Sequence, residues 1–187
     1  MKIKSIISIS LFVFLSQSTI LFGQSICTTL CSEIWWQNSS LNEIKTNLAN
    51  TDNINLRDYY GFRALHFAVI NGEKNKVKIL LSMGADTNLK TDYGFTPIYF
   101  AVGKSGDPEI IRMLIQHGAK IDVKNRNGIT PLHYAAWGTP KKIKILIEAG
   151  ADINAKSNSG KTAFDLAMDN EQLVNSSVYM LLKPINH

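Results

Sequence analysis

Apolar residues recur at helical spacing in three stretches of the chain, and each stretch ends at a glycine. These apolar positions and glycines are Val77, Leu80, Leu81 and Gly84; Ile111, Leu114, Ile115 and Gly118; and Ile143, Leu146, Ile147 and Gly150. Residues three and four positions apart lie on one face of a helix. Glycine accepts the left-handed conformation at which helices commonly end. The pattern predicts three amphipathic helices, the last of which spans residues 141–149.

A shorter motif precedes these helices and shows that the chain is repetitive. The segment 128–135, Gly-Ile-Thr-Pro-Leu-His-Tyr-Ala, has counterparts that begin at Gly61, Gly94 and, in a weaker form, Gly160. The opening glycines are 33, 34 and 32 residues apart. A second motif, of which Gly-Ala-Asp-Ile-Asn at residues 150–154 is typical, keeps the same phase in the first three units. Two motifs in phase predict an array of stacked units.

Each unit has the features of two helices joined by a turn. In the third unit, Thr130 can cap a helix through its hydroxyl, and Pro131 suits the first helical position. Ala135 and Ala136 narrow the apolar face, so that neighbouring helices can approach closely. The stretches between units, such as residues 88–94, are expected to project as hairpins.

These residues closely resemble the ankyrin repeat, whose pattern is Gly-x-Thr-Pro-Leu-His-x-Ala-Ala followed by Leu-Leu-x-x-Gly-Ala-Asp-x-Asn. The resemblance covers roughly residues 27–183. It implies an all-α ankyrin-repeat solenoid of paired antiparallel helices with projecting β-hairpin loops. We expect a degenerate N-terminal capping repeat, three full repeats and a C-terminal capping repeat, at residues 26–57, 58–90, 91–124, 125–156 and 157–187.

Residues 1–25 have the three parts of a secretory signal peptide, with cleavage expected near residues 18–25. Lys2 and Lys4 precede an apolar stretch, and residues 16–19 interrupt that stretch well short of the ~20 residues of a spanning helix. We therefore expect a periplasmic or secreted protein, with no stable membrane insertion after cleavage. A protein anchored through the uncleaved segment is the alternative. Residues 21–25 resemble the end of a bacterial signal peptide, and we therefore expect a bacterial source.

Two cysteines, Cys27 and Cys31, directly follow the predicted signal peptide. Export would place them in an oxidising compartment, where a disulfide can form. Their spacing on a regular helix does not favour such a bond without strain, so two free thiols remain the alternative. Two cysteines without neighbouring histidines do not make a metal site.

The charge of the chain argues against a nucleic-acid partner and says little about other partners. The formal net charge is +5, and without Lys2 and Lys4 there are 18 basic and 15 acidic residues. The chain has no run of Lys and Arg interleaved with aromatic residues that would follow a phosphate backbone. We therefore expect no nucleic-acid partner.

The sequence offers no catalytic constellation, and we expect no catalytic residue, cofactor or metal. His66 and His133 occupy the histidine of the repeat, whose ring is expected to brace the turn by hydrogen bonding. Tyr99 and Asp165 replace it in the other units. The chain contains no Gly-x-Ser-x-Gly, phosphate loop or His-Glu-x-x-His.

The resemblance implies that a protein partner binds the concave side, at the hairpin tips and the exposed edge of the first helices. The positions expected there are Tyr59, Tyr60, Tyr93 and Arg126 at the tips, Phe62, Phe95 and Ile129 after the opening glycines, and Ile70, Lys104 and Trp137 on the helices. Exposed aromatic residues often anchor protein interfaces. The alternative for Phe62, Phe95 and Ile129 is that they pack against one another along the hairpin stack.

The leading functional hypothesis is a non-enzymatic, monomeric adaptor that binds a protein partner. One concrete form is an immunity or protective protein that covers a toxin or stabilises an envelope enzyme. An effector that acts on a host protein is the alternative. A small enzyme or ligand carrier would need a convergent polar pocket, which the repeat pattern does not supply.

Overall fold

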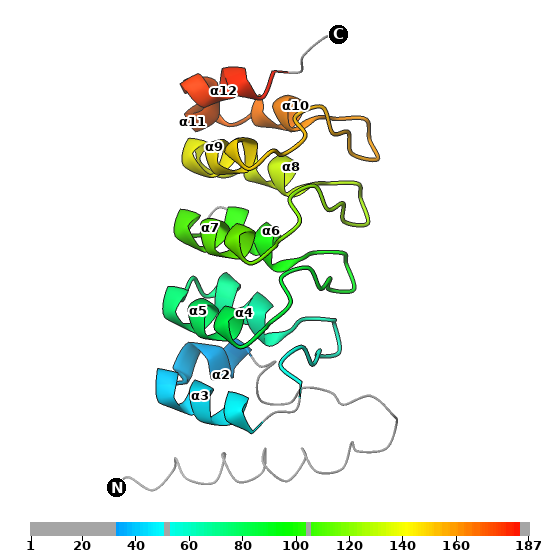
Figure 1. The fold of residues 1–187 in the computed structure, drawn as a ribbon. Helices are drawn as coiled ribbons and strands as arrows, with labels where there is room; N and C mark the ends of the chain where they lie inside the picture. The colour runs from blue at the N-terminus through cyan, green and yellow to red at the C-terminus, as the bar shows by residue number, and fades with distance from the viewer. Residues whose placement is uncertain (1–32, 51–52, 104–105, 184–187) are drawn as a thin grey trace, which may run out of the picture.

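A computed structural model describes residues 33–50, 53–103 and 106–183 of the chain. Pairs of short helices stack into an elongated column, and loops project from one side of it (Figure 1). In chain order the helices are α2 (Glu33–Asn38), α3 (Leu41–Ala49), α4 (Ala64–Ile70), α5 (Lys74–Ser82), α6 (Pro97–Val102), α7 (Pro108–Gln116), α8 (Pro131–Ala135), α9 (Pro140–Glu148), α10 (Ala163–Ala167), α11 (Glu171–Val174) and α12 (Ser177–Leu181). The predicted all-α solenoid is confirmed.

The helices form two layers. The inner layer contains α4, α6, α8 and α10, each in contact with the next, and the outer layer contains α3, α5, α7 and α9. The core lies between the layers, where Leu65, Ile98 and Leu132 of the inner helices meet Leu80 and Leu114 of the outer helices. All five side chains are buried, because each layer turns its apolar face toward the other.

The signals predicted to start and stop helices act as expected. The Thr130 hydroxyl accepts a hydrogen bond from the His133 backbone N–H, and Pro131 opens α8. The outer helices are followed by Gly84, Gly118 and Gly150, at φ angles of 85°, 82° and 90°. An L-residue with a side chain rarely adopts this conformation, so glycine fixes where each outer helix stops.

The projecting loops lie where hairpins were predicted, but they contain little β-pairing. Within the described ranges there is no β-strand, and the one β-bridge joins Arg57 to Arg63. The loops are instead held mainly by hydrogen bonds from side chains and from neighbouring loops, as described below.

Several predictions concern residues that the structure does not describe. The signal peptide, Cys27, Cys31 and Lys104 all lie outside the described residues. Among the residues that are described, no helix is both long and apolar enough to cross a membrane.

Candidate interaction surface

Neighbouring loop tips are joined by backbone hydrogen bonds. The N–H groups of Asp92, Arg126 and Asn158 donate to the carbonyl oxygens of Tyr60, Tyr93 and Asn127, at 3.0, 3.4 and 3.0 Å. Glycine permits this close approach: a Cβ built on Gly128 would lie 2.7 Å from the Asn158 nitrogen, and its φ is 71°. The tips therefore form a continuous row.

Each tip is also closed by its own polar side chain. In the first tip, Asp58 Oδ1 accepts hydrogen bonds from the N–H groups of Tyr60 and Phe62, at 2.9 and 2.7 Å. Asn125 does the same in the third tip. The guanidinium of Arg57 binds both carboxylate oxygens of Asp92, at 2.8 and 2.9 Å, and so links the first tip to the second. These bonds hold the tips in one conformation.

Three of the predicted tip residues are exposed aromatics on this frame. Tyr59, Tyr60 and Tyr93 are 77%, 55% and 54% exposed. The rings of Tyr59 and Tyr60 meet edge to face with centroids 5.1 Å apart. The Arg126 guanidinium lies 6.0 Å from the centre of the Tyr93 ring. We call these four residues the tyrosine tip cluster.

The residues after the opening glycines lie at the base of the tips and are half-buried. The Phe62 ring contacts Phe67 and Phe100, and the Phe95 ring contacts Phe100 and Tyr134. Phe62 and Phe95 thus each pack against the ring of Phe100, and Ile129 packs against the core. These side chains combine a structural role with a partly exposed surface.

Ring contacts continue across the inner layer to the far end of α8. Successive centroids from Phe62 to Phe100, Phe95, Tyr134 and Trp137 lie 5.7, 5.9, 6.1 and 5.7 Å apart. We call these five residues the aromatic ladder. Phe100 and Tyr134 were not among the predicted site residues, although both occupy the variable position directly after the repeat histidine or its replacement.

Two of the three residues predicted on the inner helices, Ile70 and Trp137, lie away from the tips. Ile70 ends α4 and Trp137 follows α8, and their side chains are 37% and 50% exposed. Each inner helix begins next to a tip, so its last residues lie at the opposite end from the tip. The structure therefore divides the predicted site into a tip region and a helix-end region, which the aromatic ladder connects.

The repeat histidines form hydrogen bonds within their own turn, as predicted, and also to the next repeat. His66 Nδ1 accepts from the Arg63 N–H at 3.1 Å, and its Nε2 lies 3.3 Å from the Phe95 carbonyl oxygen of the next repeat. His133 Nε2 makes the corresponding bond to the Lys161 carbonyl oxygen, at 2.9 Å. Burial, and secondarily the positive charge of Arg63, lower the pKa of His66 to about 4. This ring is therefore neutral at physiological pH.

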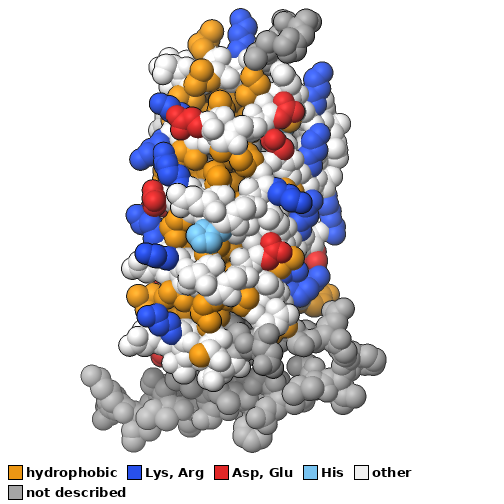
Figure 2. Space-filling view, viewed as in Figure 1, with side chains coloured by type: hydrophobic (Ala, Val, Ile, Leu, Met, Phe, Trp, Pro, Cys, Tyr) orange, Lys and Arg blue, Asp and Glu red, His pale blue; other side chains and the backbone are white. Residues whose placement is uncertain are grey.

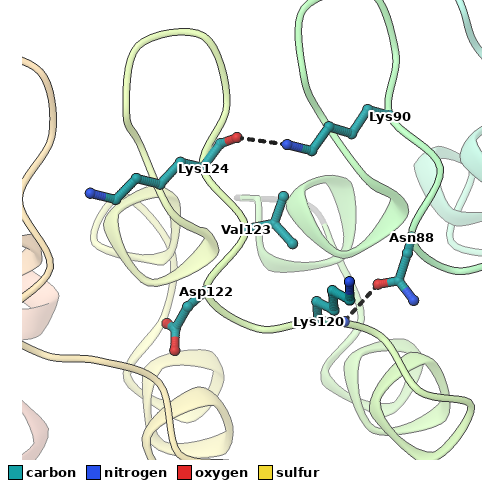
Figure 3. Close-up of a pocket in the computed structure, with 6 residues that line it drawn as sticks. All are labelled: Asn88, Lys90, Lys120, Asp122, Val123 and Lys124. Carbon is teal, nitrogen blue, oxygen red and sulfur yellow. Dashed lines mark hydrogen bonds between the residues drawn. The ribbon is translucent and has the colours of Figure 1, made fainter.

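Lys and Arg side chains lie along both the left and the right edge of the face seen in Figure 2. A shallow pocket of about 450 Å³ between two loops is lined by Asn88, Lys90, Lys120, Asp122, Val123 and Lys124 (Figure 3). In it, the Lys90 ammonium donates to the Lys124 carbonyl oxygen, while the Lys124 side chain points away toward the Lys156 carbonyl oxygen. These lysines join loops and do not converge on a ligand.

Comparisons with known proteins identify the repeat and nothing more specific. A family model of ankyrin repeats in three copies matches residues 83–157 and 104–186. A model of the single ankyrin repeat matches residues 60–92. No curated protein matches the chain.

Proposed function

The chain belongs to the ankyrin-repeat family, whose repeats generally mediate protein–protein interaction, and from that premise we propose that it binds a protein partner through the tyrosine tip cluster. In this proposal the aromatic ladder adds a second contact region. The protein acts as a monomer, without catalysis of its own, after export to the periplasm or the cell exterior.

The observation that carries the proposal is the exposure of three tyrosines on a hydrogen-bonded row of tips. Tyrosine offers a large amphipathic surface at a small cost in side-chain entropy, and it is enriched among the residues that dominate interface energies. The bonds between and within the tips fix the backbone beforehand. Binding then loses little conformational entropy, which favours affinity.

The aromatic ladder supports the same surface. Phe62, Phe95, Phe100 and Tyr134 are only partly buried, so apolar ring surface remains open beside the tips. A partner that covers both regions would bury a core of aromatic rings within a polar rim, which is the usual composition of a protein interface.

The sequence features of residues 1–25 support export. Lys2 and Lys4 before an apolar stretch are typical of a signal peptide. An exported binding protein acts by covering or stabilising its partner, and an immunity or protective protein is the concrete form we propose. An effector that binds a host protein is the alternative.

The binding proposal is tested by affinity capture of partners with the full chain, followed by measured affinities for variants. We expect Tyr59→Ala and Tyr93→Ala each to weaken binding of a captured partner about tenfold or more, because they remove anchor side chains. The control is Met83→Ala, which truncates an exposed side chain outside this surface. Equal affinities for all three variants and the parent chain would contradict the proposal.

Export is tested separately by expressing the full chain and sequencing the N-terminus of the recovered protein. We expect a soluble periplasmic or extracellular product that begins after a residue between 18 and 25. A product that retains Met1 and stays with the membrane would favour the anchored alternative.

A further inference from the structure

The turn after α8 and the turn before α11 enclose a shallow pocket of about 550 Å³, with Trp137 on one side and Asp169 and Glu171 on the other. Asn170 joins the two turns, because its side-chain amide donates to the carbonyl oxygens of Ala136 and Gly138, at 2.9 and 3.1 Å. The pocket walls belong to adjacent units of the stack, and this bridge holds them in place.

The two walls have complementary chemistry for a cation. The Trp137 indole is half exposed, and Tyr134 contacts it edge to face at 5.7 Å. Asp169 and Glu171 are exposed, and neither carboxylate has an ion-pair partner in the described part of the chain. A half-exposed indole beside two carboxylates can attract a positively charged group by cation–π and ionic interactions.

The acidic residues at the equivalent turns of other units differ, because the chain neutralises them itself. Glu73, before α5, pairs with Lys76 at 2.7 Å. Asp107, before α7, pairs with Lys74 at 3.1 Å. Among the described residues, the turn before α11 thus carries two carboxylates without an ion-pair partner, although basic residues outnumber acidic ones in the sequence.

We propose that this pocket binds the guanidinium group of an arginine side chain presented by the protein partner. This inference rests on the proposed function and names the chemistry that the partner contributes at the helix-end region. Arginine fits better than other cations because its planar group can stack on the indole while its N–H groups bind carboxylates in pairs. The occupant is an arginine on an exposed loop or terminus, since the pocket is shallow and open to solvent.

The test titrates the full chain with N-acetyl-arginine amide and follows the indole N–H resonance of Trp137 by NMR, assigned with the Trp137→Phe variant. We expect this resonance to shift and saturate with a Kd on the order of 10 mM, the strength of one cation–π contact with one exposed ion pair. The citrulline analogue has nearly the same shape without the charge. We expect it to leave the resonance in place.

Charge removal supplies the matched control. The double variant Asp169→Asn with Glu171→Gln is expected to weaken arginine binding about fivefold or more. The double variant Asp86→Asn with Glu148→Gln loses the same charge at exposed positions elsewhere and should bind like the parent chain. Thermal unfolding of both variants checks that the fold is intact.

Three results would overturn the inference: no shift with arginine, equal shifts with citrulline, or unchanged binding by the Asp169 and Glu171 variant. None of them bears on the tyrosine tip cluster, whose test uses partner affinity. Conversely, arginine binding here would stand even if the tip variants left partner affinity unchanged.

Discussion

The central repeat, residues 91–124, differs from its two neighbours at two buried positions. Where the neighbours have His66 and His133 near the start of the inner helix, the central repeat has Tyr99. Eight residues before the glycine that ends the outer helix, the neighbours have Lys76 and Lys142, and the central repeat has Ile110. All six side chains are buried.

The exchange of histidine for tyrosine changes which groups the side chain bonds to, and it leaves the hydroxyl of Thr96 without a hydrogen-bond partner among the described residues. The Tyr99 hydroxyl reaches the carbonyl oxygens of Val123 and Ile129, the latter at 2.6 Å. In the next repeat, the Thr130 hydroxyl donates to His133 Nδ1 at 2.8 Å. Tyrosine has no such acceptor there, and the buried Thr96 hydroxyl has no hydrogen-bond partner within the described residues.

In the outer layer, the two buried lysines also donate hydrogen bonds to backbone carbonyl oxygens. Lys76 Nζ donates to the Trp36 carbonyl oxygen and to Glu73, and Lys142 Nζ donates to the Gly103 carbonyl oxygen. Trp36 lies in the second half of α2 and Gly103 directly follows α6, so both carbonyls are near the C-terminal end of a helix, where positive charge is favoured. The position of Lys76, Ile110 and Lys142 is buried, so an empty space there would be costly. An apolar side chain can fill it, and so can a lysine whose amine has a carbonyl partner.

Removal of the Tyr99 side chain should destabilise the protein more than any other change considered below. Tyr99→Ala should lower the free energy of unfolding by about 4 kcal/mol, because it leaves a cavity and removes the hydrogen bonds from the hydroxyl to the carbonyl oxygens of Val123 and Ile129. Tyr99→Phe keeps the ring and should cost about 1–2 kcal/mol. Urea unfolding followed by circular dichroism measures both. Equal costs would mean that the hydroxyl, and not the ring, supports this repeat.

Substitutions of Lys142 test whether the buried lysine contributes mainly by filling space in the core. Lys142→Ala should destabilise the protein by about 3 kcal/mol, since it leaves a cavity in the core. Lys142→Ile installs the residue type of the central repeat and should cost less than about 1 kcal/mol, because Gly103 keeps its bond from the Gly106 N–H. A cost for isoleucine as large as that for alanine would show that the amine itself is required.

Acid should destabilise the neighbours of the central repeat through their histidines. Unfolded His66 titrates near pH 6.5 and the folded ring at about 4, so between these values the unfolded chain binds more protons. Stability should therefore fall as the pH falls, with His66 contributing about 2 kcal/mol between pH 7.5 and pH 5. Burial also lowers the pKa of His133, which acts in the same direction.

The variant His66→Gln isolates the contribution of that ring. Urea unfolding of parent and variant at both pH values should show a smaller pH-dependent loss in the variant. The same loss in both proteins would assign the acid sensitivity to other groups.

The smallest change in the free energy of unfolding is expected at two equivalent threonines, Thr96 and Thr130. Thr96→Val removes the hydroxyl that lacks a partner and should raise the free energy of unfolding by about 1 kcal/mol. Thr130→Val removes a hydroxyl that bonds to His133 and caps α8, and it should lower this free energy by about 1 kcal/mol or more. The two midpoints in urea should shift in opposite directions. A loss of stability in both variants would indicate that Thr96 has an unrecognised partner.

The repeat units could be predicted from the sequence because their signals are local. Helix starts such as Thr130-Pro131 and stops such as Gly84 act on the backbone within a few residues. Surface exposure at the tips followed as well, since Tyr59 and Tyr93 lie between two elements whose faces were known. The burial of Lys76 and Lys142 could not be predicted in this way, because lysine is rarely buried and their carbonyl partners lie about 40 residues away.

The repeat, its register and the order of inner and outer helices could all be predicted from the residues alone, because phased motifs set the backbone of each unit. Which side chains of different units meet became clear from the folded structure. The aromatic ladder and the pocket between Trp137 and Glu171 each join residues from separate repeats. Such contacts depend on side-chain volume and on the stacking of neighbouring units, and the repeat pattern specifies neither for its variable positions.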